Sequence, residues 1–228
     1  MGTKGEDFDI ELVRQARAGL GESPALMVDA GIAWHDDHET ALRRAEAFAA
    51  FDLTWLEEPL APEAVEAYGE LSRRSPTPIA AGEGCDTVRA ATDLVEHGRL
   101  HCLQIDPGRV GGITPSMETV KLARRRGAVW VNHTYKSHIS LAVAMTVFAG
   151  EQDWPWLEYC ESGSPLIDAL VGTPLTMDAE GYVSLPARPG LGIDGTWRMR
   201  SSLSAASRST STGAASVRQG RCELNRRA

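Results

Sequence analysis

Three carboxylate residues end short apolar stretches of this 228-residue chain, at intervals of about one strand plus one helix. Asp29, Glu57 and Glu83 are 28 and 26 residues apart. A helix usually brings parallel strands back to the same end of a sheet, so the three side chains should meet there. Hard oxygen ligands of this kind suit Mg²⁺, whereas zinc sites use histidine and cysteine. The spacing therefore predicts a magnesium site, and strand alternation leaves open whether Glu57 or Glu58 faces it.

Three more polar residues, Asp106, His133 and Glu158, continue the series in phase. Asp106 and His133 are 27 residues apart, which places them on consecutive predicted strands. A carboxylate beside an imidazole fixes its tautomer and raises its basicity, so these two residues could form an acid/base pair. Glu158 could donate a hydrogen bond to a substrate carboxylate if its neighbours keep it protonated. A salt bridge at the rim of the sheet is the simpler interpretation of Glu158.

Six predicted strands that alternate with helical segments would position these residues. The strands are expected at 25–29, 53–57, 79–83, 102–106, 129–133 and 156–158. A repeat of this length also occurs in solenoids, but no leucine or small-residue consensus recurs between the units. Closing a parallel sheet into a barrel gathers all strand ends on one face, where barrel enzymes have their active sites. The pattern predicts an α/β fold, a TIM-type (β/α) barrel domain that covers residues 1–194.

The composition is that of an ordinary globular protein, with 43% hydrophobic and 24% charged residues. The formal net charge of −8 argues against a nucleic-acid partner. The sequence shows neither an apolar stretch of about 18 residues nor the apolar core of a signal peptide. We therefore expect no membrane partner and a cytoplasmic location. The four cysteines lack paired spacing, which indicates reduced thiols.

Residues 195–228 differ from the rest of the chain. From Arg198 onward the sequence has seven arginines and one glutamate, in a serine-rich stretch with few large apolar residues. Such a segment buries too little surface to order itself, so we expect a disordered basic tail. A basic arm for nucleic acid or another partner is disfavoured, because no aromatic residues are interleaved with the arginines.

Seven motifs in sequence order resemble the barrel of the enolase superfamily, in its mandelate racemase and muconate lactonizing enzyme group. They are Met27-Val-Asp29, Trp55-Leu-Glu-Glu-Pro59, Ala81-Gly-Glu83, Gln104-Ile-Asp106 followed by Gly111-Gly112, Asn132-His133, Trp156-Leu-Glu158 and Pro189-Gly-Leu-Gly-Ile193. The resemblance spans about residues 8–194. It implies a Mg²⁺ cofactor bound by Asp29, Glu57 and Glu83.

By the same resemblance, His133 and Asp106 form an acid/base dyad, and Glu158 donates a hydrogen bond to the enolate. The implied reaction removes the proton next to a carboxylate, with the enediolate held by the metal, and then expels the hydroxyl beta to that carboxylate. The substrate would be a small acid sugar, and the enzyme a lyase, a sugar-acid dehydratase. Racemisation or epimerisation of a 2-hydroxy acid is the alternative. An aldolase-type barrel is disfavoured, since no lysine at a strand end could form a Schiff base.

Proteins that this chain resembles have parts that the sequence does not show. They carry an N-terminal capping domain and two further strand–helix units, the second with a Lys-x-Lys motif that supplies another acid/base group. The strands seen here would be numbers three to eight, so we expect an incomplete barrel. Lys4 does not take the role of that lysine, because no strand precedes it. A second copy or another chain could complete the barrel at its open edges, and an inactive remnant that binds metal or a partner is the remaining alternative.

Overall fold

The computed structural model describes residues 1–134, 136–149, 156–160, 165–195 and 217–223. The chain divides into two compact units. The first comprises Met1–Ile105 and Met117–Trp130, and the second Asp106–Ser116 and Val131–Ala228. Each unit has a packing arrangement of its own.

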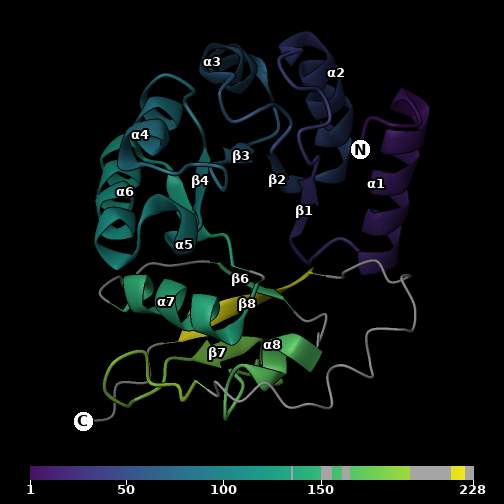
Figure 1. The fold of residues 1–228 in the computed structure, drawn as a ribbon. Coiled ribbons are helices and arrows are strands. Elements are labelled where there is room, and N and C mark those ends of the chain that lie inside the picture. The colour runs from purple at the N-terminus through teal and green to yellow at the C-terminus, as the bar shows by residue number, and fades with distance from the viewer. Residues whose placement is uncertain (135, 150–155, 161–164, 196–216, 224–228) are drawn as a thin grey trace. The chain divides into compact units, whose positions relative to one another are not determined.

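The first unit is built on a parallel sheet (Figure 1). Among the described residues this sheet has five strands in the order β1-β2-β3-β4-β5. The register pairs Met27 with Trp55 and Asp29 with Glu57. The strands are β1 (Leu26–Asp29), β2 (Leu53–Glu57), β3 (Ile79–Ala81), β4 (Cys102–Ile105) and β5 (Val129–Asn132), whose last two residues belong to the second unit. The predicted α/β fold with a parallel sheet is confirmed over these strands.

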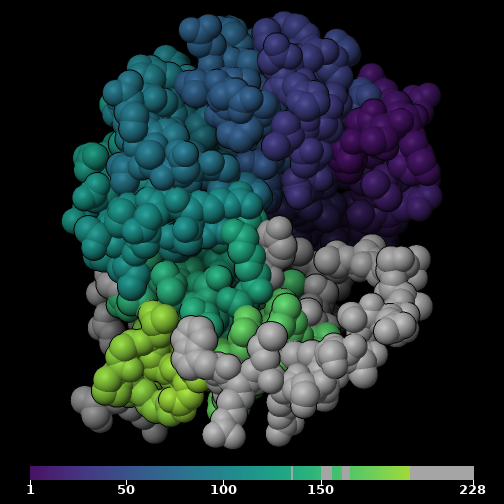
Figure 2. Space-filling view, viewed as in Figure 1, coloured from purple at the N-terminus to yellow at the C-terminus, as the bar shows by residue number. Residues whose placement is uncertain are grey.

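Helices follow the strands of this sheet and pack against one another in sequence order. Two of them begin at side chains that accept a backbone N–H of the first turn. Asp37 accepts from Thr40 N at 3.0 Å, and Thr87 accepts from Ala90 N at 3.2 Å. Figure 2 shows the outer surface of these helices, from α1 in purple to α4 in blue-green. The helices are α1 (Glu6–Leu20), α2 (His38–Phe48), α3 (Val65–Arg74), α4 (Val88–Glu96) and α6 (Ile113–Arg126), with a 3₁₀ turn at Ala49–Phe51.

The core of the first unit lies between the sheet and these helices. Side chains from both layers are fully buried, and they include Phe48, Leu56, Leu71, Ile79, Leu94 and Leu103. Burial of such side chains stabilises a fold by about 1.5–3 kcal/mol each. Among the described residues, the largest fully buried side chain is Trp130, whose indole N–H donates to Thr119 Oγ1 at 2.9 Å. The apolar residues of the strands thus lie in the buried core, and the polar residues lie at the strand ends.

A buried ion pair joins α1 to α2 inside this unit. Arg44 Nε donates to Asp9 Oδ2 at 3.1 Å, and both side chains are almost fully buried. The Asp9 carboxylate also accepts the backbone N–H of Gly2, at 3.1 Å to each oxygen. The Arg44 guanidinium lies 5.8 Å from the centre of the Trp34 ring. Because an unpaired buried charge is costly, the pair fixes how the two helices meet.

The second unit contains a mixed sheet. In the described residues its order is β6-β8-β7, with β8 antiparallel to β6 and parallel to β7. Its strands are β6 (Leu157–Cys160), β7 (Tyr182–Ser184) and β8 (Val217–Glu223), and its helices are α5 (Pro107–Val110), α7 (His138–Phe148) and α8 (Pro165–Ala169). In the described chain, no helix is both long and apolar enough to cross a membrane.

Two features of this unit differ from the sequence-based expectation. We expected the strand at 156–158 to continue the parallel series, but β6 pairs with β8 instead. The Asn132 side chain connects β5 to β6, since its amide donates to Glu158 O at 3.0 Å and accepts from Glu158 N at 3.0 Å. We expected no regular structure after residue 194, but Val217–Glu223 forms β8. The sequence signal missed β8 because its arginines and glycine do not alternate with large apolar residues.

Candidate active site

The three predicted metal ligands lie at consecutive strand ends of the first unit. Asp29 is the last residue of β1, and its register partner Glu57 is the last residue of β2. Glu83 follows β3 by two residues, in a turn closed by a hydrogen bond from Cys85 N to Gly82 O at 3.0 Å. Asp29 is exposed, and its Oδ1 accepts from Gly31 N at 2.7 Å. Parallel pairing has therefore put all three carboxylates at one edge of the sheet, as the spacing predicts.

Gly82 allows the chain to reach Glu83. Its φ of +127° is a conformation that side chains rarely adopt. A β-carbon at this position would lie 2.8 Å from the backbone oxygen of Gln104, on the neighbouring strand β4. The glycine in Ala81-Gly-Glu83 is thus required by backbone geometry, and it sets where the third carboxylate leaves the sheet.

Glu57 has a pKa shifted from its usual range. Burial is the largest cause and raises its pKa above the usual range. Hydrogen bonds from Gln104 and from Trp55 Nε1, the latter at 3.1 Å, act in the opposite direction. The negative charges of Asp29 and Glu83 raise the pKa of Glu57 further. The three carboxylates thus repel one another at the strand ends.

The neighbouring residue Glu58 faces other surroundings. Burial raises the pKa of Cys85 to about 12, and the charge of Glu58 is the largest additional cause. The pKa of Tyr68 is raised in the same way, by burial and then by Glu58. Glu58 therefore lies near Tyr68 and Cys85, while Glu57 lies within reach of the charges of the other two carboxylates. This difference supports Glu57 rather than Glu58 at the predicted metal site, and that assignment stays a prediction.

The donor set fits a hard divalent cation. Carboxylate oxygens are what Mg²⁺ prefers, and a cation would offset the burial of the Glu57 charge and its repulsion from Asp29 and Glu83, which together raise the pKa of Glu57. Within the described residues, no three histidine, cysteine, aspartate or glutamate side chains are close enough together to hold an ion as they stand. Asp29, Glu57 and Glu83 as metal ligands therefore remain a prediction.

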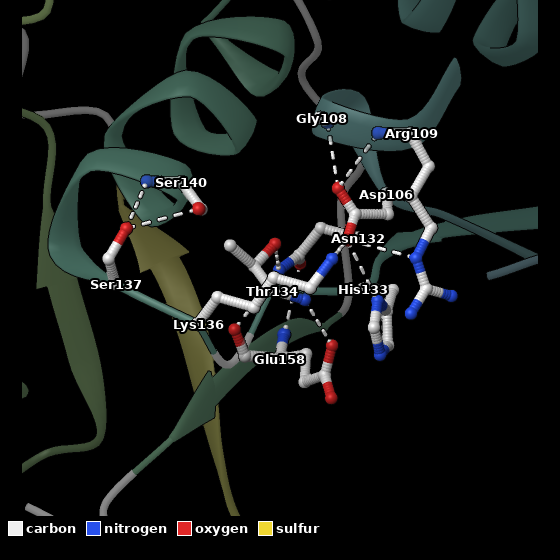
Figure 3. A network of polar contacts seen from close by, with 10 residues as sticks. All are labelled: Asp106, Gly108, Arg109, Asn132, His133, Thr134, Lys136, Ser137, Ser140 and Glu158. Carbon is white, nitrogen blue, oxygen red and sulfur yellow. Dashed lines mark hydrogen bonds and ion pairs between the residues drawn. The ribbon is translucent and has the colours of Figure 1, made fainter. Parts of the chain in front are cut away.

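Asp106 is the centre of a polar network in the second unit (Figure 3). Its Oδ1 accepts the backbone N–H groups of Gly108 at 2.7 Å and Arg109 at 3.3 Å, which makes Asp106 the N-cap of α5. Its Oδ2 accepts from His133 Nδ1 at 3.2 Å and from Lys136 Nζ at 2.6 Å. Burial tends to raise the pKa of Asp106, but these hydrogen bonds and the charge of Lys136 outweigh it and hold the pKa well below its usual range.

The structure thus brings together Asp106 and His133, the predicted acid/base pair. Both side chains are about 3% exposed. Because Nδ1 carries the proton that is donated to the carboxylate, Nε2 becomes the basic nitrogen of a neutral His133. This arrangement can accept or deliver a proton at one defined atom.

Of the two side chains that donate to Asp106 Oδ2, Lys136 is the one that the sequence patterns did not single out. It stands three residues after His133, in the loop that leads to α7. Only three lysines occur in the whole sequence, and this one alone follows a predicted strand end closely. Its position after a strand end, in a sequence with so few lysines, is the feature that could have identified Lys136 as a member of the site.

Glu158 is held by the residues that flank His133. Its Oε2 accepts the backbone N–H of Thr134, and its own backbone is held by the Asn132 amide. The same amide donates to Thr134 Oγ1 at 2.6 Å. Glu158 therefore has a fixed place beside the dyad, while its role as a hydrogen-bond donor remains a prediction.

Known proteins share both this fold and much of this sequence. L-talarate/galactarate dehydratase of Salmonella typhimurium is 34% identical over 185 residues, which are 81% of this chain and 44% of that enzyme. A predicted mandelate racemase from Rhodobacter sphaeroides superposes with a TM-score of 0.80 at 34% identity, over 86% of this chain and 51% of that one. L-talarate dehydratase from Polaromonas sp. JS666, crystallised with Mg and L-glucarate, gives a TM-score of 0.72 at 31% identity, over 86% and 52%.

The chain therefore spans about half the length of the relatives that it matches. Within that half, the family model described as Enolase C-terminal domain-like matches residues 1–198. The expected resemblance is confirmed by this match and by the mandelate racemase and acid-sugar dehydratase relatives. The chain belongs to the enolase C-terminal domain-like family.

Proposed function

We propose that this chain carries the metal and acid/base residues of a Mg²⁺-dependent sugar-acid dehydratase. The hydrogen bond between His133 Nδ1 and Asp106 Oδ2 is the observation that carries the proposal, because it prepares Nε2 for proton transfer. The similarity to an L-talarate/galactarate dehydratase supports an acid sugar as substrate.

The reaction divides into two proton transfers. His133 Nε2 accepts the proton from the carbon next to the substrate carboxylate, and the electron pair of the broken C–H bond moves into that carboxylate. That electron pair then returns to form the double bond between the alpha and beta carbons as the bond to the beta hydroxyl breaks. The imidazolium delivers its proton to that oxygen, which leaves as water. Asp106 keeps the imidazole oriented and stabilises its charged form in between. Glu158 donates a hydrogen bond to the carboxylate as charge accumulates on it.

Asp29, Glu57 and Glu83 would hold the Mg²⁺ ion. When bound, this ion supplies Lewis-acid stabilisation of negative charge on the substrate carboxylate. The carboxylates themselves contribute negative charge at the strand ends, with Trp55 and Gln104 bonded to Glu57.

Racemisation of a 2-hydroxy acid is the second candidate. It is favoured by the TM-score of 0.80 with a predicted mandelate racemase. Both reactions begin with removal of the same proton, so His133 and Asp106 would have the same first task. The two reactions differ in their second step, since a racemase returns a proton to the opposite face of the same carbon and releases no water.

The proposed function can be tested with the full chain and a panel of acid sugars that includes L-talarate, galactarate and L-rhamnonate. With Mg²⁺ present, we expect formation of 2-keto-3-deoxy acids and exchange of the substrate proton in D₂O. His133→Asn should abolish both, whereas His97→Asn, which changes an exposed histidine at the end of α4, should abolish neither. Proton exchange without a keto product would favour the racemase, and turnover unaffected by His133→Asn would refute both candidates.

Metal binding is tested separately by calorimetry with Mg²⁺. Glu57→Gln and Glu83→Gln should each remove binding, because each takes away a charged oxygen donor. Glu58→Gln is the matched control, since Glu58 lies near Tyr68 and Cys85 and is not one of the predicted ligands. Equal binding by wild type and both test variants would contradict the assigned ligands.

A further inference from the structure

Two side-chain nitrogens share one oxygen of Asp106. Lys136 Nζ lies 2.6 Å from Oδ2, and His133 Nδ1 lies 3.2 Å from the same atom (Figure 3). The other oxygen, Oδ1, is taken by the backbone N–H groups of Gly108 and Arg109. A carboxylate has about four acceptor positions, so Asp106 is saturated and the shortest of its contacts to a side chain goes to lysine.

The position of Lys136 is unusual for a surface lysine. Its side chain is 43% exposed, but the carboxylate to which it bonds is 3% exposed. An ion pair between two exposed groups contributes little. Here the negative partner is shielded from water, so its charge is felt strongly by groups around it.

Charged groups from several elements lie around His133 in the described part of the second unit. Asp106 precedes α5, and Arg109 of α5 places Nε 3.9 Å from Asp106 Oδ2. Lys136 comes from the loop before α7. Glu158 comes from β6 and bonds to Thr134, the residue after His133. Two carboxylates and two cations thus belong to the polar network that includes His133, and removal of one cation would leave an excess of negative charge there.

We propose that Lys136 is a positioning residue that fixes Asp106 and limits how strongly this carboxylate stabilises the protonated form of His133. An aspartate bonded to histidine alone favours the imidazolium, which would keep the ring protonated and unable to accept a proton. Lys136 takes part of the negative charge of the same oxygen and repels a proton on the imidazole. The lysine therefore keeps His133 neutral, and able to act as a base, at lower pH.

The proposal rests on the proposed function only where it says what the neutral imidazole is for. The electrostatic part concerns side chains of this chain alone. It can be measured on the full chain without metal, substrate or turnover.

The experiment is an NMR titration of the histidine ring signals in the full chain. The His133 signal is assigned by its loss in His133→Asn. Lys136→Met removes the cation, and we expect the titration midpoint of His133 to rise by about one pH unit. Lys136→Arg keeps a cation near Asp106 and should leave the midpoint close to that of wild type. Lys121→Met, at an exposed lysine of α6, is the matched control and should change nothing.

An unchanged or lower midpoint in Lys136→Met would overturn the proposal, as would an equal rise in Lys136→Arg. Loss of folding in Lys136→Met is detected by circular dichroism, and the comparison then uses Lys136→Gln under the same criterion. If the chain has turnover, the acidic limb of its kcat/KM profile should move to higher pH in Lys136→Met. A shifted midpoint in a chain without turnover would refute the proposed function and leave the assignment of Lys136 standing.

Discussion

Gly82→Ala should destabilise the first unit, because the glycine is closely packed and has a backbone conformation that disfavours side chains. The new β-carbon would lie 2.8 Å from Gln104 O and 2.9 Å from Leu103 Cδ1. The leucine methyl group can move, but the carbonyl oxygen belongs to β4, which pairs with β3. A strained backbone conformation costs about 1–3 kcal/mol and overpacking costs about as much again. We therefore expect the free energy of unfolding to fall by about 2–6 kcal/mol.

The assay is urea denaturation followed by circular dichroism, with Gly19→Ala as the control. Gly19 lies in α1, and a β-carbon there would have no atom within 4 Å, so alanine should stabilise the helix by about 0.5–1 kcal/mol. Glycine-to-alanine substitution should thus lower the free energy of unfolding at position 82 and raise it at position 19. A Gly82→Ala chain as stable as wild type would refute the argument from close approach.

Two further predictions concern buried charges. Arg44→Met should lower the free energy of unfolding by about 3–5 kcal/mol, because it leaves the buried Asp9 without its cation. The control is Arg14→Met, which breaks an exposed ion pair and should have little effect in the same urea titration. The depressed pKa of Asp106 contributes stability that is present above the unfolded-state pKa of about 3.9 and lost as pH falls through the lower folded-state pKa. Asp106→Asn should therefore flatten the dependence of stability on pH below about 4, and an acid limb as steep as that of wild type would contradict this.

The parallel strands could be predicted from the sequence because each combines an apolar stretch with a polar end. The spacing of Asp29, Glu57 and Glu83 indicates successive strands that run in the same direction. Because consecutive strands of this kind usually lie side by side, the three residues are expected at neighbouring strand ends. The choice between Glu57 and Glu58 could not be made in this way. It depends on where each side chain lies at the end of β2, where Glu58 already follows the last strand residue, and the nearness of Glu58 to Tyr68 and Cys85 appears only in three dimensions.

The surroundings of Asp106 were less predictable. The pairing with His133 followed from strand spacing, but Lys136 lies in a loop, where no periodicity constrains direction. The pairing of β6 with β8 was also out of reach, because it joins segments about 60 residues apart through a strand without alternation. Long-range pairing of an irregular segment depends on which strand edges the rest of the chain leaves unpaired, and not on its own sequence.

The Asn132 amide, which donates to and accepts from the backbone of Glu158, substitutes for a peptide group. Unlike a peptide group, it is attached through two rotatable side-chain bonds. A strand held by such a tether has a freedom of adjustment that a rigid backbone ladder lacks, while both hydrogen bonds are kept. The Asn132 side chain thereby connects the strand that leads to His133 with the strand that carries Glu158. Replacing its amide oxygen or nitrogen would change the alignment of the acid/base pair with Glu158, while leaving the residues of the pair and Glu158 themselves unaltered.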